Sequence, residues 1–123
     1  HVTSPCFDHN CYKQFILSFF KNKKRYDSAF SADLLKKFII NNKSEWISHD
    51  VSKKKWPRTQ DLQGLFSVNS AAFIAKRSIY LKNNDRLGKK PLPIVTKKSS
   101  GFDIDTNEDL IFFKKNFYNS KLN

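Results

Sequence analysis

Apolar residues near the start of the chain recur every three or four positions, the spacing that places side chains on one face of a helix. Residues 8–22 therefore predict an amphipathic helix, with Asp8 as its N-cap and the basic residues 21–25 at its end. The predicted apolar face is formed by Cys11, Tyr12, Phe15, Ile16, Phe19 and Phe20.

Short apolar runs after this helix predict strands. The predicted strands are residues 28–32, 66–75 and 92–96, and a short helix is predicted at residues 77–83. Pro91 and Pro93 limit the last strand to an edge or to a strand start, because proline has no backbone N–H to donate.

The segment between the first two predicted strands is largely polar. Apolar residues 38–40 and 46–48 flank a polar stretch within it, which predicts a hairpin or a pair of adjacent strands. Residues 50–64 are polar, basic and irregular. A long loop of this kind inside a domain is often a binding loop.

The last part of the chain predicts a brief extended segment at residues 102–105 and then a helix. Thr106 and Asp109 have the spacing of a capping box at the start of this helix. Its predicted apolar face consists of Leu110, Phe113 and Phe117. Strands that alternate with helices predict an α/β fold built in layers. A chain of 123 residues has room for one domain or for part of one.

The composition supports a packed domain but identifies no partner by itself. Hydrophobic residues make up 39% of the chain and include twelve Phe, which is sufficient for a core. The formal net charge of +12 suggests a polyanion partner. The basic runs are short and scattered, however, and no nucleic-acid-binding motif accompanies them, so the sequence does not favour nucleic acid over a lysine-rich solvated surface.

The apolar runs and the cysteines indicate the expected cellular location. No apolar run approaches the roughly 18 residues that span a bilayer, so no membrane partner is expected. Cys6 and Cys11 are the only cysteines. Two thiols without a disulfide framework are typical of the reducing cytoplasm, which is the expected location.

Two aspartates near the end of the chain form the sharpest chemical feature. On an extended segment Asp103 and Asp105 project on the same side, roughly 6–7 Å apart. Carboxylates so placed can share one divalent cation, and Mg²⁺ prefers oxygen ligands while it keeps water or substrate phosphates. The alternative is that Asp105 only caps the final helix and that Asp103 faces solvent.

Four segments, which cover nearly the whole chain, resemble the acylneuraminate cytidylyltransferase family and occur in the family's order. Residues 101–110, GFDIDTNEDL, resemble the segment that closes the family's catalytic domain, whose two aspartates hold the catalytic magnesium. Residues 68–75, VNSAAFIA, resemble a strand of the sugar pocket. Residues 57–62, PRTQDL, resemble a loop whose arginine binds the sugar. Residues 2–5, VTSP, resemble the end of an earlier strand.

The resemblance implies a set of site residues. The implied cofactor, Mg²⁺, is expected at Asp103 and Asp105. Contacts to an acidic sugar are expected from Arg58, Gln60, Asn69 and Phe73.

Each of these positions also has a plainer interpretation. Arg58 is otherwise one more solvated cation, and Asn69 is otherwise a partner for strand backbone in a bulge. Phe73 is otherwise a core residue. Ser4 either reaches a substrate group from its strand end or serves as a cap.

The chain departs from the family pattern on the sugar-binding side. Ser67 stands where many members that activate sialic acid have an arginine, two residues before the asparagine. Arg86 and Leu87 stand in place of a pair of phenylalanines, and Asp33 and Leu34 lie near the place of an expected His-Pro pair. Arg86 is therefore a candidate to bind the sugar carboxylate in place of the missing arginine.

The resemblance implies a layered domain of the nucleotide-diphospho-sugar transferase type, which is Rossmann-like and has a mixed sheet. No segment of the chain matches the family's nucleotide-binding loop. Residues 1–123 are therefore expected to form a single partial domain that lacks the N-terminal nucleotide-binding strands and has little or no activity alone.

The implied reaction is the activation of sialic acid, or a related 2-keto acid sugar, by CTP to give a CMP-sugar and pyrophosphate. The expected partners are CTP and the acidic sugar as substrates and a second copy of the chain in a homodimer. Two alternatives stay open. One is a non-catalytic basic module that binds nucleic acid, and the other is a degenerate regulatory subunit that pairs with an active one.

Overall fold

The computed structural model describes residues 3–118 of the chain. Its helices are α1 (His9–Asn22), α2 (Arg77–Asn83) and α3 (Asn107–Phe113), and its strands are β1 (Ser28–Leu35), β2 (Leu65–Ala75) and β3 (Pro91–Val95). A 3-10 turn, η1 (Thr59–Asp61), and a π-helical turn, η2 (Lys114–Tyr118), complete the elements. The three main predicted strands and the three predicted helices are present, and the fold is mixed α/β, as expected.

The three strands form a mixed sheet in the order β2-β1-β3. β1 is central and pairs antiparallel with β2 and parallel with β3. β3 lies at the edge of this sheet, which confirms the position that Pro91 and Pro93 predicted.

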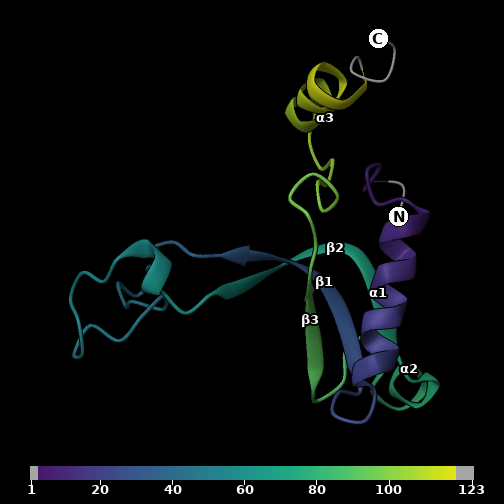
Figure 1. Ribbon diagram of the computed structural model, residues 1–123, viewed down its shortest axis with the longest axis horizontal. Coiled ribbons are helices and arrows are strands. Elements are labelled where there is room, and N and C mark those ends of the chain that lie inside the picture. Colours follow the sequence, from purple (N-terminus) through teal and green to yellow (C-terminus); the bar gives the residue numbers. More distant parts are fainter. Residues whose placement is uncertain (1–2, 119–123) are drawn as a thin grey trace.

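α1 covers one face of the sheet (Figure 1). The Asp8 carboxylate caps the helix by accepting a hydrogen bond from the Cys11 amide at 2.9 Å, as predicted. The hydrogen bond from the Cys11 amide lowers the pKa of Asp8 and so keeps the cap ionised.

The core is made of helix rings against small strand residues. Phe15 and Phe19 of α1 are buried together with Ala29, Ala71 and Ala72 of the sheet. Alanines on the strands leave space for the rings, so the helix packs close to the sheet. The apolar face of α1 is narrower than the sequence predicted. The exposed members of the predicted face are Ile16 (42%) and Phe20 (52%).

β1 and β2 bend sharply where their register shifts. The shift lies between Phe30 and Ala32 of β1, and on the opposing strand Ser70 adopts a left-handed backbone conformation with φ of 59°. Beyond this bulge the two strands stay paired with each other, turn away from β3 and continue into a projecting arm (Figure 1). We call residues 36–64 the arm.

The arm has a small aromatic cluster of its own. The cluster consists of Phe38, Trp46, His49 and Trp56, whose ring centroids lie 5.0 to 6.0 Å apart. The predicted pairing of residues 38–40 with 46–48 is present only as an isolated antiparallel bridge, between Ile40 and Trp46. The rings act together with two backbone hydrogen bonds across this pairing, from the Ile47 amide to the Ile39 carbonyl at 3.0 Å and from the Asn41 amide to the Glu45 carbonyl at 2.9 Å.

The C-terminal segment begins with the predicted capping box. Thr106 Oγ1 accepts from the Asp109 amide at 3.2 Å, and Asp109 Oδ2 accepts from the Thr106 amide at 2.9 Å. Phe113 and Phe117 stack near Phe102, as their spacing predicted. The third member of the predicted apolar face, Leu110, is 36% exposed.

Among residues 3–118, the helices are all too short or too polar to cross a membrane.

Candidate functional site

Asn69 lies at the bend of β2 and joins three separate parts of the chain. Its Nδ2 donates to Asp33 Oδ1 of β1 at 3.2 Å and to Thr96 Oγ1, just after β3, at 2.9 Å. Its Oδ1 accepts from the Ala71 amide at 3.3 Å. We call Asp33, Asn69, Thr96 and Gly101 the junction cluster, because the arm and the C-terminal segment diverge from this point.

The orientation of the Asn69 amide follows from its partners. A carboxylate such as that of Asp33 only accepts hydrogen bonds, and the backbone N–H of Ala71 only donates. The amide nitrogen of Asn69 must therefore face Asp33, and its oxygen must face Ala71. Both Nδ2 hydrogens of Asn69 are then in use, on Asp33 and Thr96.

Gly101 packs directly on this cluster. A Cβ at Gly101 would collide with Asn69 Nδ2 and would lie 2.9 Å from Thr96 Oγ1 and 3.0 Å from Asp33 Oδ1. Only a residue without a side chain fits here without movement of its neighbours. The close approach fixes the start of the segment that carries Asp103.

Asp103 and the N-terminal segment contact each other next to this turn. Ser4 Oγ donates to Asp103 Oδ1 at 3.5 Å, and the Ile104 amide donates to the Thr3 carbonyl at 2.8 Å. Ser4 is buried and Asp103 is half-buried. Asp105 is exposed, and its backbone amide donates to Asp109 Oδ2 at 3.3 Å.

This arrangement bears on the alternatives for the two aspartates. Thr106, not Asp105, is the N-cap of α3. Asp103 does not simply face solvent, because it is half-buried beside Ser4. The alternative that Asp105 caps the final helix is therefore wrong, whereas Asp103 is partly exposed and partly covered by Ser4.

The donor set suits Mg²⁺ in its chemistry. Asp103 and Asp105 offer carboxylate oxygens, and the Ser4 hydroxyl lies beside the first of them. Among residues 3–118, no group of three or more Asp, Glu, His or Cys side chains could hold a metal ion. A site with one or two carboxylates is nevertheless typical of Mg²⁺, which takes its other ligands from water and substrate phosphates.

Phe73 and Arg86 meet at a separate cavity beside β2. The Arg86 guanidinium carbon lies 4.7 Å from the centroid of the Phe73 ring, a cation–π contact. Both residues line a cavity of about 490 Å³, together with Tyr12 and Tyr80. Phe73 is half-buried, so it lines an opening rather than only filling the core.

A second cavity, of about 580 Å³, adjoins the junction cluster. It lies between α1 and the end of β3 and is lined by Thr96, Lys97 and Ser100 on one side and by Asp8 on the other. Thr96 belongs both to this cavity and to the junction cluster. A ligand here would therefore lie close to the turn that leads to Asp103.

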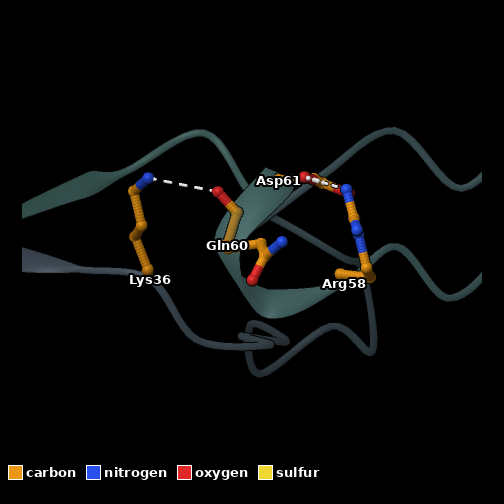
Figure 2. Close-up of polar contacts among 4 residues, drawn as sticks. All are labelled: Lys36, Arg58, Gln60 and Asp61. Atoms are coloured by element: carbon orange, nitrogen blue, oxygen red, sulfur yellow. Dashed lines mark hydrogen bonds and ion pairs between the residues drawn. The ribbon is translucent and has the colours of Figure 1, made fainter.

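Arg58 and Gln60 lie in the arm, away from the other predicted site residues. Figure 2 shows Arg58 facing Asp61, with Nε to Oδ2 at 2.9 Å and Nη2 to Oδ1 at 3.2 Å. The Gln60 carbonyl accepts from Lys36 Nζ at 3.2 Å. The four steps along β2 from Leu65 to Asn69 alone span about 13 Å. The structure thus brings Asn69 and Asp103 into one region and leaves Arg58 and Gln60 in another.

Asp33 and Thr96 are site residues that the sequence analysis did not assign. Asp33 carried a signal, because it is a charged residue within an otherwise apolar run that forms a strand. Thr96 carried none, since a threonine after a strand is common. Only the fold shows that the Asn69 amide donates hydrogen bonds to both Asp33 and Thr96.

Comparison with known proteins adds no assignment to this geometry. The sequence matches no protein-family model, and it matches no curated protein either.

Proposed function

We propose that this chain is part of a cytidylyltransferase that activates sialic acid, or a related 2-keto acid sugar, with CTP. The observation that carries the proposal is the meeting of three of the four family-like segments at one end of the sheet. Ser4 of the first segment contacts Asp103 of the last, and Asn69 of the strand segment lies against Gly101. Parts so distant in the chain are expected to meet if they build one site.

The proposed reaction is attack by the anomeric hydroxyl of the sugar on the α-phosphate of CTP. The sugar oxygen forms a bond to the α-phosphorus and the hydroxyl proton passes to solvent. The bond from the α-phosphorus to the oxygen that bridges to the β-phosphate breaks, and pyrophosphate leaves with that oxygen. Mg²⁺ on Asp103 and Asp105 would neutralise phosphate charge and lower the pKa of the attacking hydroxyl. The Ser4 hydroxyl, which donates to Asp103 at 3.5 Å, would orient that carboxylate.

The side chains of Phe73 and Arg86 suit an acidic sugar, although Phe73 lies four strand positions, about 13 Å, from Asn69 and their cavity shares no lining residue with the junction cluster. An aromatic ring suits the carbon face of a sugar, and a guanidinium at 4.7 Å from that ring suits its carboxylate. The proposed contacts of Arg58 and Gln60 have no such support. The Arg58 guanidinium already binds both oxygens of Asp61.

Magnesium-dependent binding of CMP-sialic acid to the purified chain tests the proposal. We expect titration calorimetry to detect binding with Mg²⁺ and to lose it with EDTA or in Asp103→Asn. The matched control is Glu108→Gln, an exposed carboxylate in the first turn of α3, which should leave binding unchanged. Binding that is insensitive to both EDTA and Asp103→Asn would contradict the proposal.

The second candidate is a module that binds single-stranded nucleic acid through the arm. Trp56 is 61% exposed and directly follows three exposed lysines, Lys53, Lys54 and Lys55. Exposed rings beside positive charge suit base stacking and phosphate contacts. Affinity for an oligonucleotide that falls steeply with salt, and that Trp56→Ala weakens, would support this function. Binding of CMP-sialic acid would instead favour the enzyme.

A further inference from the structure

The junction cluster lies where three segments must be held in a fixed relation. Asn69 connects β2 to Asp33 of β1 and to Thr96 after β3. Gly101 rests on the same amide. The turn that follows β3 is closed by the amides of Ser100 and Gly101, which both donate to the Lys97 carbonyl, at 2.8 and 3.1 Å.

Asn69 is poorly placed to contact a substrate itself. It is 9% exposed, and its two N–H groups already bind Asp33 and Thr96. A sugar hydroxyl that accepted from this amide would have to displace one of those partners. The displaced partner would then be left without its donor in a closed site, which costs free energy.

The same contacts suit a different role. The segment of residues 97–103 leaves the edge of the sheet and reaches Asp103, whose carboxylate accepts from Ser4. Ile104 is held to Thr3 by a backbone hydrogen bond of 2.8 Å. Asn69 and Gly101 connect the bend of the sheet to the start of this segment, and the Thr96 amide also donates to the Ala32 carbonyl of β1 at 3.0 Å.

We propose that Asn69 is a positioning residue, anchored by Asp33 and Thr96, that holds residues 97–103 so that Asp103 stays beside Ser4. The Asp33 carboxylate, on β1 next to the arm, and the Thr96 hydroxyl, just after β3, each accept one hydrogen bond from the Asn69 side-chain amide. The consequence for Mg²⁺ binding rests on the proposed function. The positioning itself rests only on the contacts of the junction cluster.

Hydrogen exchange of the Ile104 amide in the full chain tests the positioning directly. The variants are Asn69→Ala and the nearly isosteric Thr96→Val, which removes the hydroxyl acceptor and keeps the volume. Both should lower the protection of Ile104 by about tenfold or more, relative to that of the Phe19 amide inside α1. Asp33→Asn keeps an oxygen that can accept from Asn69. The protection of the Ile104 amide in this variant should therefore stay within a few-fold of that in the original chain.

A Mg²⁺ titration of the same proteins, followed by NMR, separates the inference from the proposed function. If Ile104 loses protection and Mg²⁺ binding weakens at least tenfold in Asn69→Ala and Thr96→Val, both stand. If Ile104 loses protection but the original chain binds no Mg²⁺, the positioning role stands and the proposed metal site fails. If Ile104 keeps its protection in both variants, Asn69 does not position this segment, whatever the titration shows.

Discussion

Replacing Gly101 by alanine places a methyl group where the junction cluster has no space for it. The new Cβ would collide with Asn69 Nδ2 and would lie 2.9 Å from Thr96 Oγ1 and 3.0 Å from Asp33 Oδ1. Relief requires the Asn69 amide to move away from both acceptors. The backbone itself accepts alanine, because none of the described glycines has a positive φ.

The magnitude follows from the two hydrogen bonds that the movement breaks. One joins neutral groups and the other ends on the Asp33 carboxylate, so their joint loss costs about 2–4 kcal/mol. Alanine also reduces the freedom of the unfolded chain, which stabilises the variant by about 0.4–1 kcal/mol. The net expectation is a loss of about 1–3.5 kcal/mol in the free energy of unfolding.

Gly64→Ala is the matched control. A Cβ at Gly64 would also collide, but only with side-chain atoms of Leu34, which is 44% exposed. Its free energy of unfolding should stay within about 0.5 kcal/mol of the original value.

Urea unfolding followed by far-UV circular dichroism is the suitable assay for both variants. Both tryptophans, Trp46 and Trp56, lie in the arm, so fluorescence would report on the arm rather than on the sheet. A Gly101→Ala protein as stable as the original, or equal losses in the two variants, would refute the reasoning.

Three further changes test other parts of the structure. Thr106→Ala removes the acceptor of the capping box and should cost about 1 kcal/mol, seen as fraying of α3 and faster proteolysis after residue 105. Phe15→Ala empties a site that is 3% exposed and should cost about 3–5 kcal/mol in urea unfolding, whereas Phe20→Ala, at 52% exposure, should cost less than about 1 kcal/mol. Burial works to raise the pKa of Asp27, but hydrogen bonds from Ser28 Oγ and the amides of residues 89 and 90 together outweigh it and lower the pKa. Because its pKa is lowered on folding, the Asp27 carboxylate stabilises the fold at pH values above its unfolded-state pKa. This stabilisation is lost as the pH falls through the folded-state pKa, so the loss lies below about pH 4. Asp27→Asn should therefore be less stable at pH 7 and should lose less stability on acidification to pH 2.5, whereas an unchanged acid limb of the stability curve would contradict the assignment.

Local signals in the sequence predicted most of the elements. Asp8 before an apolar period and Thr106 three residues before Asp109 are cues that act within one helical turn, and both caps formed as expected. Pro91 and Pro93 likewise fixed the edge position of β3 through their missing donors.

The bend of β1 and β2 could not be predicted in this way. The left-handed residue at the bulge is Ser70, not a glycine, and the sequence indicated a bulge only through the alternative role of Asn69 as a partner for strand backbone, which its bond from the Ala71 amide confirms. The partners of Asn69 lie 36 and 27 positions away, at Asp33 and Thr96, and only the sheet order brings them together. Periodicity also overestimated the buried face of α1, because Phe20 has the right spacing but is exposed.

The pairing of Leu35 with Leu65 closes the antiparallel ladder just before the arm begins. Opposite residues in such a ladder have Cα atoms about 5 Å apart, a gap that a two-residue turn can bridge. The arm is therefore an insertion in the architectural sense, connected to the rest of the protein at a single narrow base. Evolution could lengthen, shorten or exchange it without disturbing the register of the sheet, so its sequence is free to specialise independently of the core.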